Sequence, residues 1–197
     1  MLHKILEPYN IILASASPRR AELLKLLGLE YTVRVSNVDE PENDDEPAQQ
    51  AIRHAMNKAV AISLNSGERD MVIAADTIVV LDGRILGKPE HEDMAAHYLK
   101  QLSGREHIVI TAICVSVNNR LVCDHEQSRV RFAELSDTEI TEYVASKEPM
   151  DKAGAYGIQG LGSQFISEIE GCYFNVMGFP IHKFYRLVNA LRQEGLL

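Results

Sequence analysis

The sequence predicts an α/β protein with a mixed sheet, on three observations. Helical and strand-like segments alternate along the 197 residues, a pattern typical of α/β proteins. The dipeptides Asp82-Gly83 and Asn118-Asn119 each separate two strand-like runs, which predicts antiparallel hairpins. Strands joined through helices favour parallel pairing, so both kinds of pairing are expected in one sheet. The length suffices for one substantial core, and we expect a single domain over residues 1–197.

The first strand and helix meet at residues 15–20, which have the sequence SASPRR. The apolar run 11–14 predicts a buried strand, and the residues from Pro18 onward predict a helix that stops at Gly28. Ser17 is a favourable N-cap, and Pro18 suits the first helical position. Hydroxyls, guanidinium groups and free helix N–H groups therefore meet at a strand-to-helix turn, where α/β proteins gather phosphate. An ordinary capped helix with solvated arginines explains the six residues equally well.

The other elements follow from apolar periodicity, a capping box and turn residues. The alternating run 31–36 is typical of a strand, and glycines mark a loop at residues 154–162. In chain order, the remaining predicted elements are a helix over 48–64, strands over 71–81 and 85–86, a helix over 91–102, strands over 108–117 and 121–132, a helix over 137–146 behind the capping box Ser136-Asp137-Thr138-Glu139, a strand over 165–169 and a last helix from Pro180.

The net charge of −8 argues against binding to the backbone of DNA or RNA, which proteins normally contact through a basic face. An acidic protein can still bind a nucleotide where its few cations gather in a cleft. No apolar run is long enough to span a bilayer, and the N-terminus lacks the apolar core of a signal peptide. Cys114, Cys123 and Cys172 are odd in number and widely spaced, which indicates neither a disulfide framework nor a zinc site. We therefore expect a cytoplasmic protein without membrane contact.

Asp76 is the most unusual carboxylate, because it lies inside the apolar segment 72–80. A buried charge costs roughly several kcal/mol unless it is paired, hydrogen-bonded or bound to a metal. A structural aspartate at a bend between strands is the alternative, and we favour function because an ionisable group at a strand end usually faces a cleft. If no cation lies nearby, Asp76→Asn is expected to leave the stability of the metal-free protein unchanged or raised.

Asp39 and Glu40 follow Val38 at the end of another predicted strand. Two carboxylate sites and water are the usual ligands of Mg²⁺ or Mn²⁺, which also bridge substrate phosphates. We therefore predict a metal site formed by Glu40 and Asp76. A solvated acidic loop is the alternative, and we accept it for the later members of the acidic run 39–46.

Lys58 and Lys88 are the candidate phosphate-binding cations besides the two arginines. Most lysines are solvated, and Lys88 is the stronger candidate because a glycine and a proline flank it. Gln159 lies in the glycine-rich loop, which matches neither a Walker A loop nor a dinucleotide fingerprint. The side-chain amide of Gln159 can form hydrogen bonds with the edge of a base. A flexible loop without a binding role is the alternative for this segment. The seven histidines form no metal-binding motif, so core or surface roles are expected for them.

Together, these motifs resemble the Maf family of nucleotide pyrophosphatases, also called septum-formation inhibitor proteins. The resemblance covers nearly the full length, and its specificity comes from many spaced blocks in the same order. The blocks are residues 15–20, 38–40, Lys58, 75–77, 87–89, 102–104 and 152–160.

The resemblance implies an elongated, twisted mixed sheet with flanking helices, in two lobes around a central cleft, related to the inosine-triphosphate pyrophosphatases. It implies hydrolysis of dTTP and UTP, and of modified pyrimidine nucleotides, to the monophosphate and pyrophosphate with a divalent metal, Mg²⁺ or Mn²⁺. Such an activity would limit the incorporation of modified nucleotides into nucleic acids. The sequence YGIQG at residues 156–160 is similar to the dTTP/UTP branch. The alternative is a nucleotide-binding regulator of cell division that acts through a protein partner.

The resemblance also implies roles for single residues. The proton acceptor maps to Asp76, and the specificity positions map to Arg19, Thr77 and Gln159. Whether Asp76 acts as base or as metal ligand stays open, as does the formation of a homodimer. The residues expected to bind phosphate carry a hydroxyl group or a positive charge, and they are Ser15, Ser17, Arg20, Lys58 and Lys88.

Overall fold

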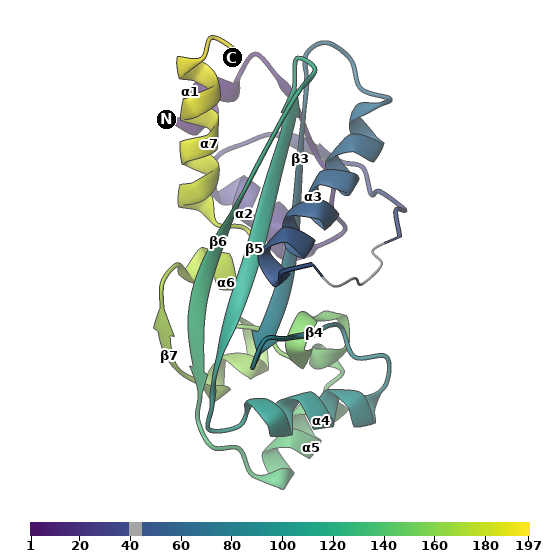
Figure 1. Ribbon diagram of the computed structural model, residues 1–197, viewed down its shortest axis with the longest axis vertical. Helices are drawn as coiled ribbons and strands as arrows, with labels where there is room; N and C mark the ends of the chain where they lie inside the picture. The colour runs from purple at the N-terminus through teal and green to yellow at the C-terminus, as the bar shows by residue number, and fades with distance from the viewer. Residues whose placement is uncertain (40–44) are drawn as a thin grey trace. The chain divides into compact units, whose positions relative to one another are not determined.

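The computed structural model describes residues 1–39 and 45–197, so the predicted metal ligand Glu40 lies outside the described residues. The described strands form one sheet in the order β2-β1-β3-β5-β6-β7, with β4 paired to β3 (Figure 1). Parallel and antiparallel pairs occur together, which confirms the predicted mixed α/β class. The strands are β1 (Asn10–Leu13), β2 (Tyr31–Val33), β3 (Asp70–Leu81), β4 (Arg84–Leu86), β5 (Glu106–Val117), β6 (Arg120–Phe132) and β7 (Ile166–Glu170).

The long helices lie where periodicity predicts them. The short helices α1 (Leu2–Leu6) and α6 (Tyr173–Val176) are not predicted, because so few residues carry no periodic signal. Among the described residues, no helix is long and apolar enough to cross a lipid bilayer. The other α-helices are α2 (Pro18–Leu26), α3 (Pro47–Ser63), α4 (Glu92–Leu102), α5 (Asp137–Ala145) and α7 (Ile181–Gln193). Three 3₁₀ helices follow α5 in the chain: η1 (Glu148–Asp151), η2 (Ala153–Ala155) and η3 (Gly160–Phe165).

The chain divides into two compact units. Unit 1 contains residues 1–76, 111–126 and 178–197, and unit 2 contains residues 77–110 and 127–177. Strands β3, β5 and β6 each run from one unit into the other, so each supplies residues to both. The prediction of a single domain over residues 1–197 stays a prediction.

Turn residues set the antiparallel pairs. In the β3–β4 hairpin, Asp82 and Gly83 have φ values of 51° and 77°, and in the β5–β6 hairpin Asn118 and Asn119 have φ values of 49° and 60°. Two-residue hairpin turns need positive φ at these positions, which glycine, asparagine and aspartate tolerate. β2 ends at Val33, short of the predicted residue 36, because its neighbour β1 offers no further residues to pair with.

Helix α2 has the predicted boundaries and the predicted N-cap residue, but not the predicted capping hydrogen bond. Pro18 is its first residue, and Gly28 beyond its end has a φ of 69°, which allows the Leu29 N–H to donate to the Leu24 carbonyl oxygen at 3.2 Å. Ser17 occupies the N-cap position, yet its side chain makes no capping hydrogen bond. The predicted capping role of the Ser17 hydroxyl is therefore wrong, although its position is right.

A disulfide joins Cys114 to Cys123, so the expectation of no disulfide is wrong. The β5–β6 turn at Asn118 and Asn119 places the two cysteines opposite each other, and their Cα atoms lie 4.1 Å apart. The pairing depends on hairpin register and not on a cysteine motif, so cysteine spacing could not predict it. Cys172 is free. The cysteines therefore lend no support to the expectation of a cytoplasmic protein.

His107 on β5 is buried in the core of unit 2. Its Nε2 atom lies 2.7 Å from the Tyr156 hydroxyl oxygen, and its ring meets Phe132 and Tyr156 edge to face. The Nδ1 atom has no hydrogen-bond partner in the described part of the chain. Burial lowers the pKa of His107 from 6.5 to about 4, so the imidazole is neutral at pH 7.

This burial predicts acid-sensitive stability. Protonation of His107 favours the unfolded chain, so its contribution is complete above pH 6.5 and is lost as the pH falls toward 4, by about 3 kcal/mol in total. We expect His107→Gln to flatten the acid limb of a plot of unfolding free energy against pH, measured by urea titration. The exposed His182→Gln is the control, and equal acid limbs in wild type and His107→Gln would contradict the assignment.

Candidate active site

The turn between β1 and α2 holds the Arg20 guanidinium in a fixed position. Its Nη1 donates to Ser15 Oγ at 2.9 Å, and its Nε donates to the Gly178 carbonyl oxygen at 2.9 Å. The buried Ser15 hydroxyl also accepts the backbone N–H of Ser17 at 3.2 Å. Arg20 is therefore not a solvated helix residue, which was the alternative interpretation. Arg19 precedes it on α2 and is half-buried.

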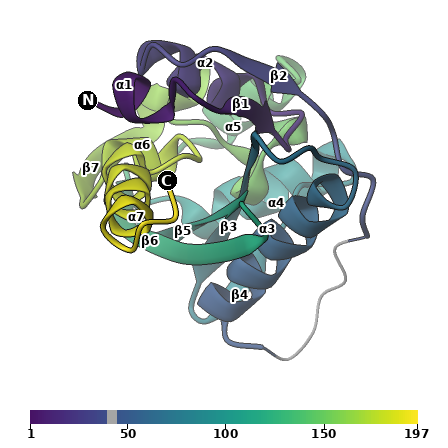
Figure 2. The ribbon, with the colours of Figure 1, turned by 90° about the horizontal axis from the view of Figure 1, so that it is seen from above.

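Asp76 on β3 is buried and bound by two side chains from α3, which runs beside β3 (Figure 1 and Figure 2). Lys58 Nζ donates to Asp76 Oδ1 at 2.7 Å. His54 Nδ1 lies 3.4 Å from Asp76 Oδ2. Residues 54 and 58 are one helical turn apart, so α3 presents both to the same carboxylate. Asp76 is therefore a paired buried charge, as its position in an apolar strand requires.

The charge state of Asp76 follows from these contacts. Burial alone would raise the pKa of the carboxyl group, but the hydrogen bond from His54, the charge and hydrogen bond of Lys58 and the charge of Arg20 outweigh it. The pKa of Asp76 therefore lies well below its usual range, and the group is ionised at neutral pH. Since the Arg20 charge acts on Asp76, the turn before α2 and the Asp76–Lys58 pair form one cluster in unit 1. We call these residues, Ser15, Arg20, His54, Lys58 and Asp76, the Asp76 cluster.

His54 is the site residue that sequence reasoning missed. The sequence predicts a core or surface role for every histidine, and His54 is indeed buried, but its Nδ1 atom faces the Asp76 carboxylate. The signal that could have found it is its spacing of four residues from Lys58 on a helix. The sequence also favoured Lys88 over Lys58. In the structure it is Lys58 that contacts the carboxylate, while Lys88 after β4 is exposed.

The predicted specificity residues have varied surroundings. Thr77 follows Asp76 on β3, so its side chain lies on the opposite face of the strand, and it is half-buried. Gln159 in unit 2 is half-buried and immediately precedes η3. Ser17 is half-buried at the start of α2. These positions leave the predicted roles of the residues as predictions.

Ser15 and Arg20 lie at the turn between β1 and the N-terminus of α2, the kind of position at which α/β proteins bind phosphate groups. Residues 10–191 match the family model described as Maf-like protein, and the chain belongs to this family. A dTTP/UTP pyrophosphatase of Syntrophomonas wolfei is 48% identical over 190 residues, which cover 92% of this chain and 100% of that protein. A dTTP/UTP pyrophosphatase of Aquifex aeolicus is 44% identical over 182 residues, 92% of this chain and 95% of that protein. The Ham1 protein of Staphylococcus aureus is a similar solved structure, with a TM-score of 0.47, 18% identity and coverage of 80% and 79%.

The Asp76–Lys58 pair changes the expected effect of Asp76→Asn on stability. The two side chains are 10% and 14% exposed, so removing the carboxylate charge leaves a buried ammonium group without its partner. We expect a loss of about 3 kcal/mol in the free energy of unfolding, measured by urea titration. The sequence-based expectation of unchanged or raised stability assumed that no cation lay nearby.

The double variant Lys58→Met/Asp76→Asn is the control for this effect. It removes both charges, so its loss should be clearly smaller than the sum of the two single losses. Additive losses would show that the two side chains do not stabilise each other.

Proposed function

We propose that this protein hydrolyses dTTP and UTP to the corresponding monophosphate and pyrophosphate. One observation carries the proposal: the Asp76 cluster gathers two cations, a hydroxyl and an ionised carboxylate in a chain of the Maf-like family. The related proteins named dTTP/UTP pyrophosphatase support the choice of substrate. No observation on the described residues favours the alternative of a division regulator, so we do not propose it.

The cations of the cluster suit a triphosphate. Arg20 and Lys58 together carry two positive charges beside the single charge of Asp76, so the cluster attracts polyanions. The N-terminal N–H groups of α2 add partial positive charge at the same turn. We assign phosphate binding to Ser15, Ser17, Arg20, Lys58 and Lys88.

The low pKa of Asp76 limits what its carboxylate can do. An ionised group with a pKa well below its usual range is a weak proton acceptor. It remains a strong hydrogen-bond acceptor, and it can orient a water molecule for attack on the α-phosphorus. Of the two roles that the sequence left open, this favours a negative ligand and orienting group over a general base. Arg20 and Lys58 stabilise the charge that develops on the phosphate oxygens.

A divalent cation, Mg²⁺ or Mn²⁺, fits this cluster when it arrives with the nucleotide. The described residues contain no group of three or more metal-binding side chains, and Asp76 already contacts Lys58 and His54. Mg²⁺ needs only one or two protein carboxylates when phosphates and water complete its shell. Asp76 would hold it, together with Glu40. When bound, the cation would neutralise phosphate charge and acidify a coordinated water.

Base selection is assigned to Arg19, Thr77 and Gln159. The Gln159 side-chain amide has both a donor and an acceptor, which match the O4 and N3 edge shared by thymine and uracil. A polar partner missing inside a site costs more discrimination than a missing methyl group. The amide therefore explains how one site accepts both dTTP and UTP.

Pyrophosphate release tests the proposal. Purified protein is incubated with dTTP, UTP, dCTP, ATP and GTP, each with Mg²⁺ or Mn²⁺, and we expect the highest kcat/KM for dTTP and UTP. Asp76→Asn should lose most of this activity per folded molecule, whereas Asp70→Asn, on the same strand but outside the cluster, should keep it. A wild-type protein that binds nucleotides but hydrolyses none of them would overturn the proposal.

Arg20 tests phosphate binding separately. Arg20→Lys keeps the charge but cannot reproduce the two contacts to Ser15 and Gly178. We expect about a tenfold fall in kcat/KM for Arg20→Lys and a larger fall for Arg20→Ala, the scale of one to two charged hydrogen bonds. Wild-type kinetics in a folded Arg20→Ala protein would remove Arg20 from the site.

A further inference from the structure

We propose that Glu148 and Tyr143 are positioning residues that hold the loop carrying Gln159 in the shape required for base selection. The inference rests on the proposed function, and all the contacts that support it lie within unit 2. Glu148 begins η1, Tyr143 lies on α5, and Gln159 lies between the segments they bind. Neither residue belongs to the Asp76 cluster.

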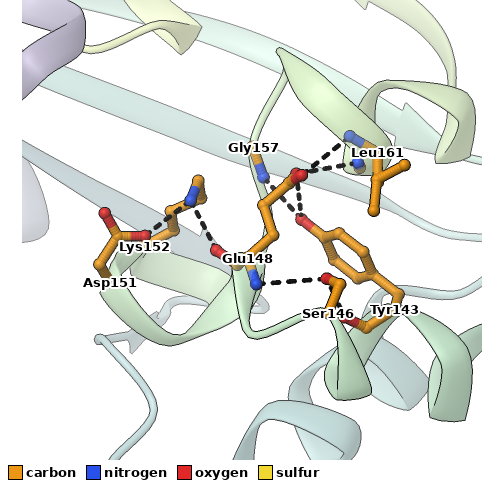
Figure 3. A network of polar contacts seen from close by, with 8 residues as sticks. Tyr143, Ser146, Glu148, Asp151, Lys152, Gly157 and Leu161 are labelled. Atoms are coloured by element: carbon orange, nitrogen blue, oxygen red, sulfur yellow. Dashed lines mark hydrogen bonds and ion pairs between the residues drawn. The ribbon is translucent and has the colours of Figure 1, made fainter.

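The two side chains bind the loop at Gly157 and at Leu161 (Figure 3), which precede and follow Gln159 in the sequence. On one side, the Tyr143 hydroxyl accepts the backbone N–H of Gly157 at 3.3 Å. On the other side, the Glu148 carboxylate accepts the N–H of Leu161 at 2.9 Å and the N–H of Gly162 at 3.1 Å. The Tyr143 hydroxyl donates to Glu148 Oε1 at 3.0 Å, which joins the two attachments.

The glycines of the loop make this close approach possible. A Cβ atom on Gly160 would lie 2.6 Å from a Glu148 carboxylate oxygen, and one on Gly162 would lie 2.5 Å from the Tyr143 hydroxyl oxygen. Gly160 also has a φ of 73°, which side-chain-bearing residues rarely adopt. Because these glycines lack a Cβ atom, the Glu148 carboxylate and the Tyr143 phenol can approach the loop backbone.

The protonation states of both groups suit their contacts. Burial opposes ionisation of Glu148, but hydrogen bonds from Leu161, Gly162 and Tyr143 outweigh it, and the pKa of Glu148 lies below its usual value. Burial and the Glu148 charge raise the pKa of Tyr143 well above its ordinary value, so the phenol stays a donor. Lys152 Nζ donates to the Glu148 carbonyl oxygen at 2.5 Å and ties down the backbone of η1.

The contacts fix the backbone and leave the Gln159 amide available. Within the described residues, the Gln159 side chain makes no hydrogen bond, whereas residues 157, 161 and 162 are bound to the two clamping side chains. The Tyr143 ring is itself held edge to face against Phe165, with centroids 5.0 Å apart. A side chain that reads a base must be held within a fraction of an ångström by supporting contacts. We infer that Glu148 and Tyr143 supply that support.

Substitution of Glu148 tests the inference through nucleotide preference. Glu148→Gln keeps the size but turns an NH₂ group toward backbone N–H donors, so at least one loop contact is lost. We expect the ratio of kcat/KM for dTTP to that for dCTP to fall about tenfold, while inhibition by pyrophosphate stays unchanged because the Asp76 cluster is intact. Glu148→Asp retains the charge and should restore part of the ratio. Glu142→Gln, a neighbouring exposed carboxylate on α5, is the control.

Tyr143→Phe provides a second test if Glu148→Gln fails to fold. It removes one hydroxyl, and with it the contacts to Gly157 and Glu148, so we expect a smaller change of the same kind. A purely structural role would lower the folded fraction and reduce turnover of all nucleotides equally. Unchanged nucleotide preference in folded variants would overturn the inference while the proposed function stands. A wild-type protein without turnover would instead overturn the proposed function, and the inference with it.

Discussion

The ion pair between Asp76 and Lys58 is the interaction on which unit 1 depends. A carboxylate in the middle of a buried strand is tolerable only with a partner, and α3 provides Lys58 and His54 one helical turn apart. The pair therefore ties α3 to β3 and keeps a negative charge in an otherwise apolar strand. The same contacts that stabilise the charge hold the pKa of Asp76 well below its usual range.

Unit 2 also contains a carboxylate that several groups bind, that of Glu148. The Glu148 carboxylate satisfies backbone N–H groups that no regular helix or strand satisfies, and the Tyr143 phenol shares this role. Glycines at positions 160 and 162 leave the space that the acceptor atoms occupy. In both units, a carboxylate links residues of different elements: Asp76 binds side chains of α3, and Glu148 binds backbone N–H groups of η3.

The turn of the β5–β6 hairpin determines which residues of the two strands lie opposite each other. The turn at Asn118 and Asn119 sets the register of β5 and β6, and that register brings Cys114 opposite Cys123. The turn could be predicted because it depends on two residues that accept positive φ. The disulfide could not, because it depends on which residues the turn places face to face.

The sequence by itself determined the long helices, the hairpin turns and the mixed class of the sheet, because these depend on periodicity and on the φ preferences of a few residues. It also marked Asp76, since a charge in an apolar strand needs an explanation. Only the tertiary structure determined which groups the site residues bind through hydrogen bonds and ion pairs. Arg20 reaches a carbonyl group 158 positions away, and Asp76 meets His54 and Lys58 from another element. Such contacts depend on how the helices pack against the sheet. Residue types and their spacing in the sequence do not specify that packing.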